Sequence, residues 1–256
     1  MAKARPFVGR KAELEQFKRV LENPAGQGVL VVGQAGMGKT WLIDRMAWIA
    51  ENHPRFKCGC VRYELTSNDP PDVVMEWMMD DAFHAGDVVE GSCDSTARRR
   101  KQWYALLTTL IPKGKDIAEL LQSLEPNRKR PTREELLDRL RLISAKMGDV
   151  GRGVFILDPH EYLSLDKDEY AEEWSIVVRD LPEKIKIVFA QRPEDVLARY
   201  PKFAQDERVV RIPPDVLGKL EEDAVDELLD QRAAETRYTS GGQRAGGQRA
   251  SPQINN

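Results

Sequence analysis

The chain has 256 residues, enough for one large α/β domain or for one domain with appendages. Hydrophobic residues make up 41% and charged residues 32%, so the composition allows a sizeable core beneath a highly charged surface. The formal net charge of −3 gives no overall basic footprint for nucleic acid, and no apolar run has the length of a membrane span.

The amino-terminal part is predicted to contain a helix followed by a buried strand. The tetrapeptide Phe7-Val8-Gly9-Arg10 precedes residues 11–21, in which apolar residues recur at helical spacing. Residues 23–26 break the chain with proline and glycine. The apolar, β-branched run 28–32 is typical of a buried strand. No apolar segment follows the basic residues at the amino terminus, so we expect no signal peptide.

This strand leads into a motif that matches the phosphate-binding loop G-x-x-x-x-G-K-[ST] at every fixed position. Between a strand and a helix start, such a loop turns backbone N–H groups towards phosphate oxygens, and the helix adds partial positive charge. We expect Lys39 to reach the β- and γ-phosphates and the Thr40 hydroxyl to bind Mg²⁺. A glycine turn with a chance Lys-Thr pair is the alternative, but the flanking elements favour the motif. The expected nucleotide-binding residues here are Gly33, Gln34, Ala35, Gly36, Met37, Gly38, Lys39, Thr40 and Trp41.

A second strand is predicted at residues 56–65, where apolar and polar residues alternate. It contains Cys58 and Cys60, and the third cysteine is Cys93. Because no partner pair has zinc spacing, we favour thiols buried in a strand over half of a metal site. So few cysteines indicate reduced thiols and a cytoplasmic location.

Helices are predicted for most of the following segment. Residues 72–83 and 116–124 have helical apolar patterns, and residues 132–147 begin with a capping-box sequence. The basic residues 98–101 stand beside aromatic residues, a pattern also seen in nucleic-acid binding. We favour instead the solvated face of an amphipathic helix.

Residues 153–158 form the second chemical landmark, because four apolar residues end in Asp158. This pattern predicts a central strand with a carboxylate at its carboxyl end, where α/β sheets bind ligands. An enzyme with a phosphate-binding loop needs an acid there to hold Mg²⁺, so we expect this role for Asp158 rather than a helix cap. Pro159 follows it, and the nearest carboxylate beyond is Glu161, which either orients water or is a first-turn helix charge.

The last predicted elements are a helix at residues 170–180 and strands at residues 185–190 and 209–212. Gln191 and Arg192 stand at the end of the first of these strands. An arginine in this position pairs with phosphate or a switch carboxylate, or else forms a surface salt bridge.

Together, the Phe-Val-Gly-Arg opening, the phosphate-binding loop and the strand ending in Asp158 resemble the AAA-like ATPase module of signal-transduction ATPases with numerous domains (STAND). NACHT, NB-ARC and origin-recognition-type ATPase domains are similar. The resemblance implies that Phe7, Val8 and Gly9 lie near the adenine base, although a strand or turn packed on the core is the alternative. It also implies that Gln191 senses the γ-phosphate and that Arg192 is the matching arginine. The family usually has an acid where this chain has Pro159, so we expect slow hydrolysis.

We therefore expect an α/β fold: a three-layer P-loop NTPase domain with a central parallel sheet over residues 1–213. A helical lid would begin at Gly218 within residues 214–235. Residues 236–256 are expected to be a disordered tail, which contains the repeated Gly-Gly-Gln-Arg-Ala of residues 241–250. The resemblance implies an ATP- and Mg²⁺-dependent switch in signalling or defence that hydrolyses ATP slowly. The lid would serve self-association or a protein partner, with no membrane or nucleic-acid partner. A motor or loader acting on nucleic acid and a non-hydrolysing, nucleotide-stabilised module are the alternatives.

Overall fold

The computed structural model describes residues 8–65, 69–86, 94–112, 114–123, 132–159, 168–191, 206–213, 217–220 and 224–227. The chain divides into two compact units. The larger unit is Lys11–Gly218, and the smaller one combines Met1–Arg10 with Lys219–Asn256.

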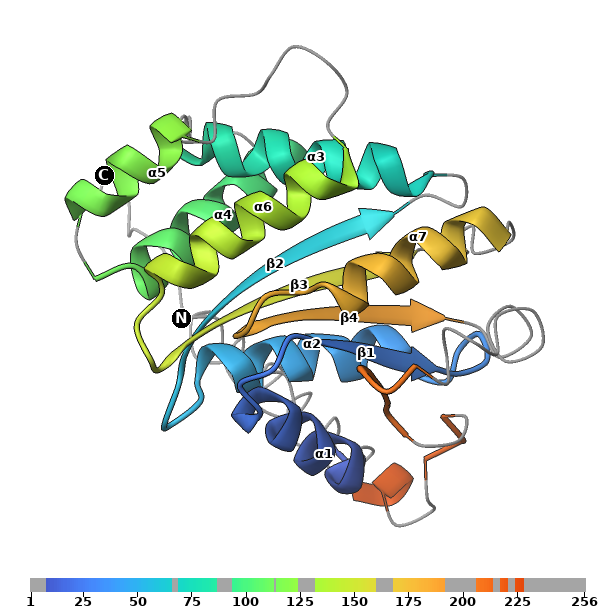
Figure 1. Ribbon diagram of the computed structural model, residues 1–256. Helices are drawn as coiled ribbons and strands as arrows, with labels where there is room; N and C mark the ends of the chain where they lie inside the picture. Colours follow the sequence, from blue (N-terminus) through green and yellow to red (C-terminus); the bar gives the residue numbers. More distant parts are fainter. Residues whose placement is uncertain are drawn as a thin grey trace, which may run out of the picture. The chain divides into compact units, whose positions relative to one another are not determined.

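The larger unit is organised around a five-stranded parallel sheet in the order β2-β3-β4-β1-β5 (Figure 1). The strands are β1 (Gln27–Val32), β2 (Lys57–Leu65), β3 (Gly151–Pro159), β4 (Ile185–Gln191) and β5 (Val209–Arg211). All five predicted strands are confirmed, with bounds that differ by a few residues. Because the strands are parallel, their carboxyl ends meet at one edge of the sheet, the edge where ligands bind in open α/β sheets.

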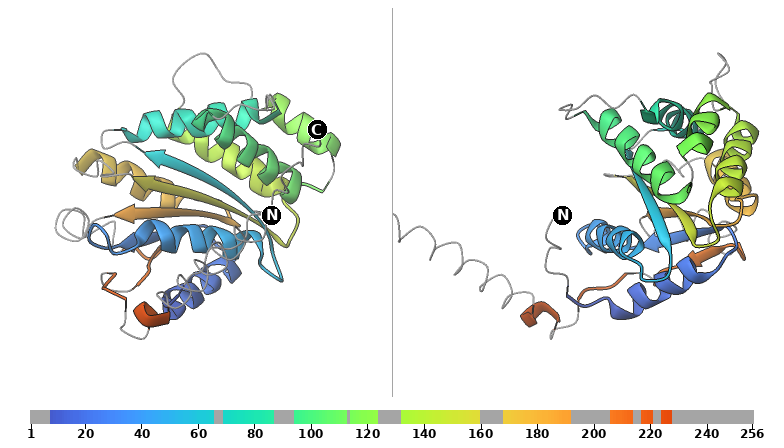
Figure 2. Two further views of the ribbon diagram at one scale, coloured as in Figure 1. Left: turned by 180° about the vertical axis from the view of Figure 1, so that it is seen from behind. Right: turned by 90° about the vertical axis from the view of Figure 1, so that its left-hand side faces the viewer.

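Helices cover both faces of this sheet (Figures 1 and 2). One face carries α1 (Lys11–Glu22) and α2 (Lys39–Glu51). Over the other face lie α3 (Pro71–Phe83), α4 (Ser95–Leu110), α6 (Arg133–Lys146) and α7 (Asp168–Arg179), together with the shorter η1 (His84–Gly86) and α5 (Gly114–Ser123). This arrangement is that of an α/β domain with a helical layer on each side of a parallel sheet. None of the described helices has the length and apolar character needed to span a membrane.

The main core lies between the sheet and the layer that contains α3, α4, α6 and α7. Trp103 of α4 packs on Phe155 of β3, and Trp174 of α7 packs edge-on against Phe189 of β4, with ring centroids 5.0 and 5.5 Å apart. Every residue of β4 is buried, as expected for a central strand of a parallel sheet.

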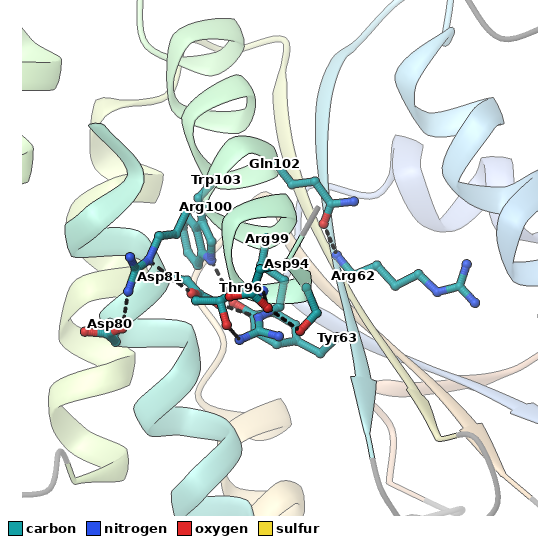
Figure 3. A network of polar contacts seen from close by, with 11 residues as sticks. Arg62, Tyr63, Asp80, Asp81, Asp94, Thr96, Arg99, Arg100, Gln102 and Trp103 are labelled. Atoms are coloured by element: carbon teal, nitrogen blue, oxygen red, sulfur yellow. Dashed lines mark hydrogen bonds and ion pairs between the residues drawn. The ribbon is translucent and has the colours of Figure 1, made fainter. Parts of the chain in front are cut away.

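Helix α4 covers the free edge of β2, and a glycine makes this close approach possible. A Cβ on Gly59 would lie 2.6 Å from the Cα of Leu106, far inside normal contact. Two hydrogen bonds also attach the helix to the strand. The backbone N–H of Arg62 donates to Gln102 Oε1 at 2.9 Å, and Trp103 Nε1 donates to the Tyr63 hydroxyl at 2.7 Å (Figure 3). An edge that would otherwise offer unpaired backbone groups is therefore covered.

The basic cluster at residues 98–101 differs from our expectation of a solvated helix face. Arg99 Nε lies 2.6 Å from Asp81 Oδ2, and Arg100 Nη2 lies 2.9 Å from Asp80 Oδ2 (Figure 3). The Asp81 side chain is only 1% exposed. The prediction is wrong for Arg99 and Arg100, because the buried Asp81 and the half-exposed Asp80 of α3 hold their guanidinium groups. Arg98, whose side chain is 65% exposed, agrees with the predicted solvated face.

The two described cysteines, Cys58 and Cys60, lie in β2 with free thiols. Burial raises the pKa of Cys58 to about 12 and also raises the pKa of Cys60. Such thiols stay protonated and unreactive at neutral pH. The expectation of strand thiols is confirmed for these two, and Cys93 lies outside the described residues.

In the smaller unit, Gly9 has a φ of 75°, a conformation that favours glycine. A Cβ there would lie 3.1 Å from Leu220 Cδ2 and 3.2 Å from Ala224 Cβ, and Val8 beside it is buried. Residues 218–220 are not helical and residues 224–227 are. The predicted helix start at Gly218 is therefore wrong.

Candidate functional site

The glycine-rich loop begins as a continuation of the sheet. The Gly33 N–H donates to the Gln191 carbonyl at 3.0 Å, and the Leu217 N–H donates to the Val32 carbonyl at 2.7 Å, so neighbours on both sides hold the end of β1. A Cβ on Gly33 would lie 2.8 Å from the Cβ of Leu217. The first glycine of the loop is thus required for close packing.

The other two glycines of the loop give it the form of an open cradle. Gly36 and Gly38 have φ values of 78° and 82°, and among the described residues nothing beyond the adjoining backbone lies within 4 Å of where a Cβ would stand. Gly38 precedes α2 and has no side chain to cap the first helical turn. Backbone N–H groups at such a helix start are suited to bind an anion.

Lys39 and Thr40 follow at the first turn of α2. The Lys39 ammonium donates to the carbonyl oxygens of Gly33 and Gln34, the latter at 2.8 Å, so its side chain reaches back across the loop. Thr40 is exposed, and Trp41 beside it is 42% exposed. The structure therefore brings the sequence-predicted loop residues together at the carboxyl edge of the sheet.

Asp158 lies near the carboxyl end of β3, where the sequence predicts it, and it is 6% exposed. Its carboxylate forms an ion pair with the guanidinium group of Arg62 from β2. The same guanidinium group also pairs with Asp44 of α2. Asp44 stands one helical turn after Thr40, on the same side of α2. Arg62 thus connects the helix that follows the loop to the acidic end of β3.

Arg62 remains charged in this arrangement. Burial alone lowers its pKa, but Asp158 and Asp44 outweigh that effect and the net result is a raised pKa. Its side chain, 18% exposed, extends from β2 away from α4 (Figure 3). The sequence analysis missed Arg62 and Asp44. The alternation of β2 could have indicated Arg62, because it places this charged residue on the same face of the strand as the buried Cys58.

Gln191 ends β4, which lies between β1 and β3. The residue is 2% exposed, and its Nε2 has no hydrogen-bond partner within the described part of the chain. A buried amide without a partner costs free energy and calls for an explanation. A ligand that accepts this hydrogen bond at the sheet edge would provide one.

Several predicted site residues are not described together with the loop, Arg62, Asp158 and Gln191. Phe7, Glu161 and Arg192 lie outside the described residues. Val8 and Gly9 belong to the smaller unit and are described only within it. Within the described ranges, no cluster of three or more His, Cys, Asp or Glu side chains could hold a metal ion by itself.

Comparison with models of known protein families gave no match. A search among curated proteins also gave no match.

Proposed function

We propose that the chain binds ATP with Mg²⁺ at the carboxyl edge of its sheet, through residues 33–40, and acts as a slowly hydrolysing nucleotide-dependent switch. The observation that carries the proposal is the open glycine cradle at the start of α2, with the Lys39 ammonium reaching across it. A lysine and a row of backbone N–H groups converging on one space form a receptor for phosphate.

The residues present suit Mg²⁺ as the partner of that phosphate. Thr40 would supply a hydroxyl oxygen and Asp158 a carboxylate, and this small set matches an ion that usually keeps waters and phosphate oxygens as its remaining ligands. When bound, Mg²⁺ would neutralise charge on the phosphate oxygens. Preference for ATP over GTP rests on the resemblance to STAND-type modules.

The roles proposed for Lys39 and Gln191 follow from their surroundings in the structure. Lys39 would exchange the carbonyl oxygens of Gly33 and Gln34 for phosphate oxygens, which carry full charge. The Nε2 of Gln191, which has no hydrogen-bond partner among the described residues, would donate to the terminal phosphate. Pro159 follows Asp158 and cannot act as a base, so the positioning of water falls to a residue such as Glu161, and turnover would be slow.

Two observations argue against a motor that acts on nucleic acid. Arg99, which lies over the rings of Tyr63 and Trp77, is paired with Asp81, and Arg100 is paired with Asp80. A guanidinium group that is already paired and partly buried does not present a free charge to a phosphate backbone.

A melting scan with ATP, ADP and GTP, each with and without Mg²⁺, tests the proposal. We expect Mg·ATP to raise the melting temperature of the parent, and Lys39→Ala to abolish the increase. Lys57→Ala is the matched control, because Lys57 is exposed at the start of β2, at the opposite edge of the sheet. If Mg·ATP stabilises the Lys39→Ala variant as much as the parent, the loop is not the binding site.

A further inference from the structure

We propose that Arg62 is a positioning residue that acts through Asp158: it serves as a built-in cation that occupies this carboxylate in the nucleotide-free chain and competes with Mg²⁺ for it. This inference rests on the proposed function and adds a level of control to the same site. The experiment below separates the failure of one from the failure of the other.

The first support is the geometry of the pair. Arg62 comes from β2 and Asp158 from β3, and the two charges meet directly, with the carboxylate almost fully buried. A buried carboxylate needs a positive partner or a hydrogen-bond donor to remain ionised. Arg62 meets this need without a metal ion. Any cation that binds Asp158 must therefore replace Arg62 or share the carboxylate with it.

The second support is that Arg62 can remain paired with another carboxylate when Asp158 binds Mg²⁺. Asp44 already bonds the other terminal nitrogen of Arg62, and its side chain is 53% exposed. Glu64 lies close enough to contribute to the raised pKa of Arg62. The Arg62 Nε is buried and has no partner among the described residues, so this guanidinium group is not fully satisfied in its present place. A shift towards Asp44 would keep Arg62 paired.

The third support is the position of Asp44 on α2. It stands one turn beyond Thr40, so the helix that begins in the phosphate-binding loop also carries the second anchor of Arg62. Occupation of the loop and the choice of partner by Asp158 are thus linked through one helix and one arginine. Arg62 would stabilise the empty site and raise the Mg²⁺ concentration needed to fill it.

The test is a Mg²⁺ titration at a fixed saturating concentration of ATP, followed by the melting temperature and by tryptophan fluorescence. We expect Arg62→Gln to lower the Mg²⁺ concentration at half-saturation about tenfold, within the range usual for energetic coupling between sites. Mg²⁺ without nucleotide should stabilise this variant and leave the parent unchanged. The matched control is Arg55→Gln, which removes the same charge from an exposed pair with Glu22.

Each outcome bears on the inference. An unchanged Mg²⁺ midpoint in Arg62→Gln, or an equal change in Arg55→Gln, overturns it while leaving ATP binding in place. If the parent does not respond to ATP at all, the proposed function fails and the inference fails with it. If Arg62→Gln does not fold, Arg62→Lys replaces it. The ammonium group of lysine lacks the fixed fork of donors with which a guanidinium group holds two carboxylates, so a smaller decrease of the midpoint is expected and an unchanged one overturns the inference.

Discussion

Lys186→Met should remove a pH dependence of stability that the parent protein shows above neutral pH. Lys186 is fully buried in β4, the strand that ends at Gln191. Its ammonium donates to the carbonyl oxygens of Asn23, at 2.8 Å, and Ala25. Burial, with a smaller contribution from the Arg152 charge, lowers the pKa of Lys186 from 10.5 to about 7.

The direction and size of the effect follow from this pKa. Between about pH 7 and pH 10.5 the unfolded chain holds a proton on Lys186 that the folded chain has lost, so the free energy of unfolding rises with pH in this window. One proton gives a slope of at most about 1.36 kcal/mol per pH unit, or about 2.7 kcal/mol from pH 7.5 to 9.5. The two carbonyl acceptors favour the charged form, so this figure is an upper limit.

Urea unfolding at pH 7.5, 8.5 and 9.5, followed by circular dichroism, measures the difference. The parent should gain stability relative to Lys186→Met as the pH rises. Lys57→Met, which alters an exposed lysine, should follow the parent. Parallel profiles for the parent and Lys186→Met would refute the reasoning, because they would mean that Lys186 has its ordinary pKa in the folded protein.

Two further substitutions address the site. Asp158→Asn should weaken binding of Mg·ATP by calorimetry more than binding of ADP without metal, because its carboxylate acts through the ion; equal losses would point to a packing role. Gln191→Leu should raise the melting temperature without nucleotide, because it removes a buried Nε2 donor that has no partner among the described residues, a cost of about 1–3 kcal/mol. It should also reduce the extra stabilisation given by ATP over ADP, and an unchanged ATP-to-ADP difference would rule out a contact with the terminal phosphate.

The positions of the strands could be predicted because their signals are local. Runs such as residues 28–32 and 185–190 are rich in apolar and β-branched residues, with Lys186 as the exception, and buried parallel strands need such residues on both faces. The capping box was also predictable: the Glu135 N–H donates to Thr132 Oγ1 at 3.3 Å, and the Thr132 N–H donates to Glu135 Oε2 at 2.8 Å. Both features depend on residues close together in the chain.

The partners of the charged residues could not be predicted in the same way. Arg62 finds Asp44 and Asp158 only after three separate elements have come together. Arg99 and Arg100 look like a solvated cluster until α3 places its carboxylates beside them. A single sequence indicates which side chains carry charge, whereas tertiary packing decides which charges are paired.

Titration calorimetry of the parent chain with Mg·ATP tests the central claim most directly, because it measures both binding and its stoichiometry. We predict saturable binding of one nucleotide per chain that is lost in Lys39→Ala and retained in Lys57→Ala. The absence of saturable binding by the parent, or equal affinity in Lys39→Ala, would contradict a nucleotide site in the glycine-rich loop.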